Sequence, residues 1–210
     1  MYFLSKEFFG KLAGIVSAVF YIWAPYHSVD IFVRGAMNES WAFIWYPLIL
    51  LFSYKLISAP SKPFRAKGGG ILLLALAWFG LLTSHNLMVL IFTPLFAIWC
   101  LFWFFKSKNY VTNVLSLTIS GAWAFGLAAF FTLPVFLEQK LVHTETLVQG
   151  YYEFTAHFAT INQLLFSRFW GYGPSVWMEN DGMSFQVGHI HWILSIFLVS
   201  LKEDILARFQ

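Results

Sequence analysis

The chain has 210 residues, of which 59% are hydrophobic, 21% are aromatic and only 11% are charged. A soluble domain usually carries about 25% charged residues, so this composition excludes an ordinary water-soluble fold, and the aromatic content excludes a disordered chain. The net charge of +3 does not indicate a nucleic-acid partner, because the basic residues are dispersed between apolar runs. We therefore expect an all-α protein embedded in the membrane.

Six apolar stretches are long enough, or nearly so, to cross a bilayer as helices. They cover residues 8–24, 40–57, 70–84, 87–105, 111–137 and 186–201. The fifth is long enough to tilt or bend, and Pro134 near its end is expected to end or kink it. We thus predict a polytopic transmembrane helical bundle that forms one membrane domain over residues 1–210. An interfacial helix follows the first span, and an aromatic-rich outer loop, residues 138–185, precedes the last.

Lysine and arginine residues divide unevenly between the two sides of this predicted bundle. One side receives Lys6, Lys11, Lys55, Lys62, Arg65, Lys67, Lys106, Lys108, Lys202 and Arg208, and the other receives Arg34, Lys140 and Arg168. Because cytoplasmic loops carry the excess of positive charge, this distribution predicts a multi-pass protein of the cell membrane with both termini in the cytoplasm. The six histidines then lie at outer span ends or in outer loops.

The segment between the first two predicted spans concentrates ionisable side chains. If it forms a short interfacial helix, Asp30 and Arg34 lie one turn apart, with Tyr26 on the same face. Glu39 stands at the mouth of the second span, where it can pair with Arg34 or be stabilised by the helix N-terminus. Ionisable residues near hydrocarbon are costly and therefore indicate function. A structural clamp made by Arg34 is an alternative of equal weight.

A short polar sequence, residues 83–86, separates the third and fourth predicted spans. So tight a turn would present His85 and Asn86 toward the outer side, where a histidine can hold a phosphate and an asparagine can bind a hydroxyl. The alternative interpretation is a polar hairpin turn that only caps two helices.

The outer loop is dense in aromatic residues. They are Tyr151, Tyr152, Phe154, Phe158, Phe166, Phe169, Trp170, Tyr172, Trp177 and Phe185. Apolar residues at helical spacing predict an interfacial helix over residues 161–170, which the sequence Gly-Tyr-Gly-Pro at 171–174 ends. Trp170 and Asp181 are candidates to bind a sugar, because aromatic faces suit sugar rings and carboxylates accept hydrogen bonds from hydroxyls. An aromatic belt that anchors the protein at headgroup level is the alternative.

Neither a metal nor a cofactor is expected. His189, His191 and His85 could imitate a three-histidine site, but histidines two residues apart on a helix point to different faces. The chain contains no phosphate-binding glycine loop, no His-Glu-x-x-His motif and no Ser-His-Asp arrangement. ATP hydrolysis and proteolysis therefore have no support.

The sequence at residues 21–39, Tyr-Ile-Trp-Ala-Pro-Tyr-His-Ser-Val-Asp-Ile-Phe-Val-Arg-Gly-Ala-Met-Asn-Glu, is followed by Tyr-Pro at 46–47. It resembles polytopic bacterial and archaeal membrane proteins labelled as 6-pyruvoyl-tetrahydropterin synthase-related. Similarity to the same proteins extends over nearly the whole chain, at residues 84–86, 133–138, 170–173 and 181–186. The label does not imply pterin chemistry, because a pterin synthase needs a compact zinc fold that these apolar spans cannot supply.

More distantly, these proteins resemble the GT-C class of multi-spanning glycosyltransferases, which use polyprenyl-phosphate sugars and carry an acidic catalytic residue in the first outer loop. Members usually have further spans before the part that matches Tyr21, so we expect this chain to be an internal portion of a longer protein. Because these polar groups converge on one side of the bilayer, our leading hypothesis is that Arg34 binds the donor phosphate and that His85 and Asn86 orient the donor. Asp30 or Glu39 would position Arg34 or take the acceptor proton.

A second hypothesis is a non-catalytic membrane protein, either a scaffold with a structural Asp30–Arg34 pair or a component of a lipid or polysaccharide carrier. A carrier should have polar residues deep in several spans, whereas these spans contain only scattered Ser, Thr and Asn. The expected partners are membrane lipids and, for an enzyme, a polyprenyl-phosphate-linked sugar donor.

Overall fold

The computed structural model describes residues 1–58, 68–107, 109–141, 143, 150, 153–176 and 181–200, and over these residues the protein is all-α. Most of the predicted loop between the second and third spans lies outside them, as do Lys62, Arg65, Lys67, Lys108, Tyr151, Tyr152, Trp177, Lys202 and Arg208. The helices, including short 3-10 and π turns labelled η, are α1 (Tyr2–Ile22), α2 (Pro25–Ser28), η1 (Val29–Val33), α3 (Met37–Ile57), α5 (Gly69–Ser84), α6 (Asn86–Lys106), α7 (Tyr110–Leu127), α8 (Ala129–Leu137), η2 (Gln139–Leu141), η5 (Phe154–His157), α9 (Ile161–Leu165) and α10 (His189–Ser200).

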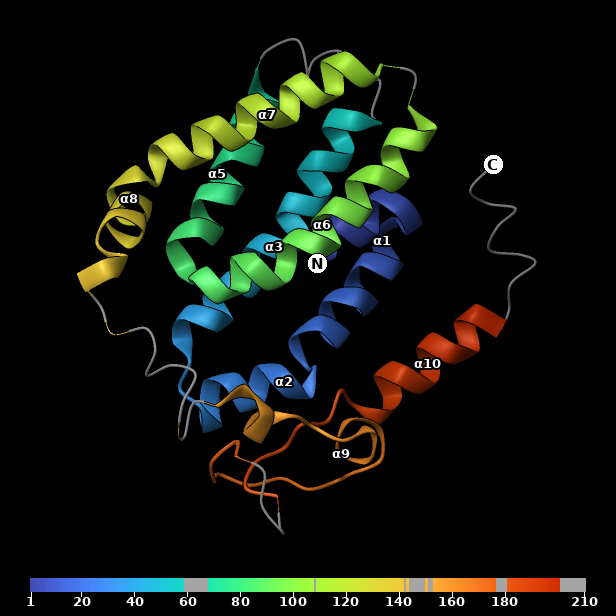
Figure 1. The fold of residues 1–210 in the computed structure, drawn as a ribbon. Coiled ribbons are helices and arrows are strands. Elements are labelled where there is room, and N and C mark those ends of the chain that lie inside the picture. The colour runs from blue at the N-terminus through green and yellow to red at the C-terminus, as the bar shows by residue number, and fades with distance from the viewer. Residues whose placement is uncertain are drawn as a thin grey trace. The chain divides into compact units, whose positions relative to one another are not determined.

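The chain divides into two compact units. The first unit consists of Met1–Ala18 and Met37–Val142, and the second of Val19–Ala36 and His143–Gln210. The long helices α3, α5, α6 and α7 all belong to the first unit, whereas α2, η1, α9 and α10 belong to the second (Figure 1).

The core of the first unit lies where α3, α5 and α6 meet. On α3 the buried residues Ala42, Ile49 and Leu56 recur every seven positions, so they form one stripe along the helix. That stripe packs against buried residues of the two other helices, which are Leu74, Ala77, Leu81, Met88 and Phe92. The rings of Tyr46 and Phe92 stack with their centroids 4.3 Å apart, and the Tyr46 hydroxyl donates to the Met88 carbonyl. The core therefore forms because apolar residues recur on one face of each helix. The contacts of Tyr46 with α6 fix how α3 and α6 are aligned along their axes.

A close approach of α3 to α5 depends on a glycine. Gly80 faces the indole of Trp45, and a Cβ at this position would lie 2.6 Å from Trp45 Cδ2. The indole Nε1 donates to Ser84 Oγ at 3.2 Å, and that hydroxyl donates in turn to the Gly80 carbonyl. The missing side chain at Gly80 thus allows a large aromatic ring to lie flat against α5.

A second contact of the first unit joins its N-terminal helix to the end of α3. Lys55 Nζ lies 3.1 Å from Glu7 Oε2, and both side chains are partly exposed. Beside this ion pair, Phe8 packs on Tyr54 and stacks on Trp103 of α6, with ring centroids 4.6 and 5.7 Å away. Because exposed ion pairs contribute little, the aromatic cluster supplies most of the stabilisation here.

Within the described residues, two helices are long and apolar enough to cross a membrane, namely α3 and α6. Two further pairs of helices are apolar enough together but are bent at a short break. These are α1 with the segment Pro25–Val33, and α7 with α8. If each pair is counted as one span, the number of candidate spans rises to four. The apolar helix α5 has 16 residues and is shorter than a typical span. On α6 the side chains of Leu90 and Ile91 are about two-thirds exposed, which is the surface expected of a helix that faces lipid. Membrane helices are thus supported, with two to four candidate spans among the described residues, and six spans are not shown.

The fifth predicted span bends, as expected, and ends at Leu137, but the bend lies at Ala128 rather than at Pro134. The helices α7 and α8 meet at Ala128 with a bend of 78°, while α8 continues through Pro134 to Leu137. The Ala128 carbonyl accepts from the N–H groups of Phe131 and Thr132 and from the Thr132 hydroxyl, the last at 3.0 Å. A threonine hydroxyl that bonds the carbonyl four residues back is a contact that often accompanies a bent helix.

In the second unit, the last carbonyls of α9 accept hydrogen bonds from residues near and within α10. The Leu164 carbonyl accepts from the Val187 N–H, and the Leu165 carbonyl accepts from the Trp192 indole. These bonds satisfy carbonyls that the end of a helix leaves without partners. They tie the start of α10 to α9 within the unit.

The predicted helix over residues 161–170 is shorter than expected, because α9 ends at Leu165. The N–H groups of Phe166 and Ser167 both return to the Asn162 carbonyl, and the Ser167 hydroxyl accepts from the Phe169 N–H. A serine that bonds nearby backbone competes with the helix, so the chain turns before it reaches the glycines at 171 and 173.

Those glycines have a different role, which is to let two segments of the second unit approach each other. Tyr172 and Met183 form an antiparallel bridge, and the Gly173 N–H donates to the Gly182 carbonyl at 2.7 Å. A Cβ on Gly173 would lie 2.8 Å from that carbonyl oxygen, which is backbone and cannot rotate away.

We predict that Gly173→Ala opens this loop. The variant should be cut by a protease between residues 166 and 188 about fivefold to a hundredfold faster than the parent, since overpacking against backbone costs about 1–3 kcal/mol. Gly150→Ala is not a fair control because Gly150 has a φ of 61°, so Arg168→Ala, which changes an exposed side chain of the same part of the chain, serves instead, with a protease that does not cut at arginine. Equal cleavage rates for Gly173→Ala and the parent would contradict the prediction.

Candidate functional site

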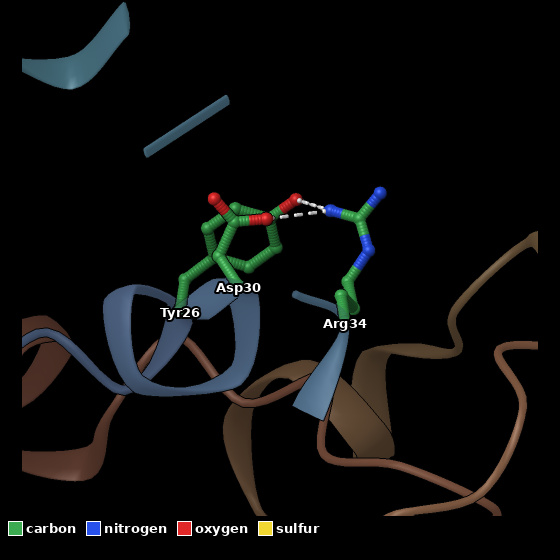
Figure 2. A network of polar contacts seen from close by, with 3 residues as sticks. All are labelled: Tyr26, Asp30 and Arg34. Carbon is green, nitrogen blue, oxygen red and sulfur yellow. Dashed lines mark hydrogen bonds and ion pairs between the residues drawn. The ribbon is translucent and has the colours of Figure 1, made fainter. Parts of the chain in front are cut away.

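The structure brings together three of the predicted site residues, Tyr26, Asp30 and Arg34. Figure 2 shows one guanidinium nitrogen of Arg34 directed at two oxygen atoms. Arg34 Nη1 donates to the Tyr26 hydroxyl at 2.7 Å and to Asp30 Oδ1 at 2.9 Å. The expected pairing on one face is therefore present, and Tyr26 takes part in it.

The backbone that positions these side chains is a short α-helix followed by a π-turn. Helix α2 begins at Pro25, whose fixed φ suits a first helical position, and the chain widens at Val29 into the π-turn η1. The Arg34 N–H reaches back five residues to the Val29 carbonyl, and Gly35 then adopts a φ of 63°. Wider turns of this kind often occur at functional sites, and the glycine allows the chain to leave the helix at Arg34.

The charges of the pair differ in their exposure. The Asp30 side chain is fully buried, whereas one-third of the Arg34 side chain is exposed. A buried carboxylate needs a partner, and the bond to Arg34 supplies one. The arrangement holds the arginine in place from its buried side and leaves part of it accessible, which suits anion binding.

Glu39 lies in the first turn of α3, as predicted, and belongs to the first unit. Its side chain is half-buried. An acidic residue is favoured there by the positive end of the helix, so its position has a structural explanation in addition to any chemical one.

His85 and Asn86 lie at the junction of α5 and α6, also in the first unit. His85 is the single extended residue between the two helices, which diverge from this junction in Figure 1. Asn86 is exposed, whereas His85 Nδ1 is buried and has no hydrogen-bond partner among the described residues. A buried polar atom of this kind is the group that a bound molecule or water would satisfy.

Trp170 and Asp181 lie in the second unit, and the structure gives each of them a local contact. Asp181 Oδ1 accepts a hydrogen bond from Gln163 Nε2, and Trp170 packs edge-to-face on Tyr172. Sequence reasoning missed Gln163. Its signal was the pattern Thr160-x-x-Gln163, a capping box that the structure confirms and that places Gln163 at the start of α9.

Two histidines of α10, His189 and His191, contact backbone carbonyls within the second unit. His191 Nε2 lies 2.9 Å from the Phe20 carbonyl, and His189 Nε2 lies 3.3 Å from the Phe166 carbonyl. Both lie on α10, and because they are two positions apart on a helix, they face different partners. Across the parts of the chain that the structure describes, no group of three His, Cys, Asp or Glu residues could hold a metal ion.

The length and apolar composition of the helices define a class, that of helical membrane proteins. The described part of the chain contains two to four candidate spans. No family model, no curated protein and no solved structure matches the chain.

Proposed function

We propose that the protein binds a polyprenyl-phosphate-linked sugar at the outer face of the cell membrane and acts as a GT-C-like glycosyltransferase. The observation that carries this proposal is the partly exposed side chain of Arg34, whose guanidinium is held by the buried Asp30 and by Tyr26. A fixed guanidinium suits the geometry of a phosphate and is already desolvated on one side, so less ordering is needed on binding. The resemblance of residues 21–39 to membrane proteins related to this class supports the same conclusion.

The proposal assigns different tasks to the acidic residues. Asp30 is buried and bound to Arg34, so it positions the arginine rather than meeting an acceptor. Glu39 as the group that takes the acceptor proton, and His85 and Asn86 as groups that orient the donor, stay predictions, since all three belong to the first unit. In this proposal Trp170 and Asp181 contact the sugar.

The proposed topology has six spans with both termini in the cytoplasm. Two features support it beyond the α3 and α6 helices. The predicted spans 70–84 and 87–105 coincide within one residue with α5 and α6. The uneven distribution of lysine and arginine favours the same orientation.

The first test is binding of farnesyl phosphate to the full chain in lipid nanodiscs, with farnesol as the probe that lacks the phosphate. The parent should bind farnesyl phosphate and not farnesol. Arg34→Gln should weaken this binding about tenfold to a hundredfold, because a charge-assisted hydrogen bond contributes about 1.5–3 kcal/mol.

Arg168→Gln is the matched control for this test, since Arg168 is an exposed arginine of the same unit. It should bind like the parent. Equal binding by Arg34→Gln and the parent, in folded protein, would remove Arg34 from the proposed site.

A structural scaffold is the second candidate, and the full burial of Asp30 favours it. The exchange variant Asp30→Arg with Arg34→Asp separates the two hypotheses. A scaffold should keep its stability and phenotype when the pair is exchanged, whereas a phosphate site should lose farnesyl phosphate binding because the guanidinium has moved. Farnesyl phosphate binding that survives the exchange would show that the phosphate does not bind at the Arg34 guanidinium, and a retained phenotype without such binding would favour the scaffold.

A further inference from the structure

The second unit exposes an unusually apolar surface along residues 154–172. Its large apolar side chains are between 39% and 74% exposed, and they are Phe154, Phe158, Ile161, Phe166, Phe169, Trp170 and Tyr172. From residue 154 to residue 176 the sequence carries a single fully charged side chain, Arg168. We name residues 154–176 the aromatic segment. Side chains of this size, exposed with almost no charge among them, mark a surface that binds something apolar.

The aromatic segment is an ordered surface. His157 Nδ1 and Ser175 Oγ lie 3.0 Å apart and join its two ends. Phe154 packs edge-to-face on Phe158, as Trp170 does on Tyr172. Because these contacts hold the exposed rings in place, little conformational entropy is lost when the surface is covered.

The backbone of the segment determines what can cover it. The capping box of α9 and the bonds to its last carbonyls satisfy the helical part, but most of the segment is neither helix nor sheet. Irregular backbone that faces lipid is not found within the hydrocarbon, where water cannot satisfy its polar groups. At headgroup level water is present, and Trp and Tyr are enriched there.

We infer that the aromatic segment lies in the headgroup region of the bilayer, with lipid as the partner of its exposed rings. The apolar helices α8 and α10 precede and follow this part of the chain, so membrane-compatible elements lie on both sides of it in sequence. Trp170, which packs on Tyr172, is left out of this inference, because the proposed function assigns it to the sugar. The inference rests on the membrane location of the chain and does not depend on glycosyl transfer.

The test places a fluorescent label at an exposed ring and measures its depth. Cys100 is buried and is first replaced by alanine, after which Tyr172→Cys and Phe154→Cys are each labelled with a nitrobenzoxadiazole dye. The full chain is placed in phosphatidylcholine nanodiscs whose lipids carry a spin label either near the headgroup or near the end of the acyl chain. Iodide in the buffer reports exposure to water. Leu95→Cys, at the middle of α6, is the control for a deep position.

The label at residues 154 and 172 should be quenched about twofold more by the shallow spin label than by the deep one, and iodide should quench it less than free dye. The label at residue 95 should show the opposite preference. Quenching by iodide equal to that of free dye would overturn the inference, and so would protection of the label by added oligosaccharide or by a second copy of the chain. Loss of farnesyl phosphate binding would leave it unaffected.

Discussion

Replacing Arg34 by alanine should lower the free energy of unfolding by about 3 kcal/mol, because the buried Asp30 carboxylate would lose the cation that its position requires. Removing one partner of a buried pair commonly costs about 3–5 kcal/mol, and the lower end applies here because Arg34 is one-third exposed. Unfolding of the detergent-solubilised protein by sodium dodecyl sulfate measures the change.

Two further variants separate the cost of the lost pair from the cost of a lost side chain. Arg168→Ala removes an exposed arginine of the same unit and should change stability by less than about 0.5 kcal/mol. Asp30→Asn combined with Arg34→Ala should recover part of the loss, since the carboxylate charge is then absent. If Arg34→Ala and Arg168→Ala unfold alike, the Asp30–Arg34 pair contributes nothing to the fold.

Gly80→Ala should also destabilise the protein strongly, by about 1–3 kcal/mol or more. The new methyl group would overlap the Trp45 indole, with Cδ2 at 2.6 Å, and the ring is held by its bond to Ser84. The indole must therefore move, and the packing of α3 against α5 must loosen with it. A thermal scan in detergent gives the shift in the unfolding temperature.

Gly126→Ala in α7 is the matched control, because a Cβ there meets nothing within 4 Å. An alanine in the helix interior should be neutral or should stabilise by about 0.5–1 kcal/mol, since glycine has the lower helix propensity. Trp45→Phe should partly rescue Gly80→Ala, because it removes the indole atoms that would overlap. A rescue variant no more stable than Gly80→Ala would show that the overlap is not the cause.

Local spacing in the sequence was sufficient to predict several elements. The apolar runs at 70–84 and 87–105 became α5 and α6 almost residue for residue, since an unbroken apolar run can satisfy its backbone only as a helix. The pairing of Asp30 with Arg34 followed from their separation by one turn. In these cases the determining interactions lie within a few residues along the chain.

The predictions that were wrong depended on local competition between side chains and backbone. The fifth predicted span bends at Ala128 and not at Pro134, and α8 runs through Pro134 to Leu137. The helix predicted to reach residue 170 ends at Leu165, and Ser167 then bonds the backbone of the following turn. Apolar spacing does not record which hydroxyl reaches which backbone group, so these ends required the structure.

By itself the sequence determined the class of the protein, because 59% hydrophobic and 11% charged residues favour apolar helices in a membrane. Only the tertiary structure decided that Asp30 is fully buried, that Gly80 faces Trp45 and that Asp181 is held by Gln163. The physical reason is distance along the chain. Composition and periodicity report on neighbouring residues, whereas burial and most of these contacts join segments that meet only when the helices pack.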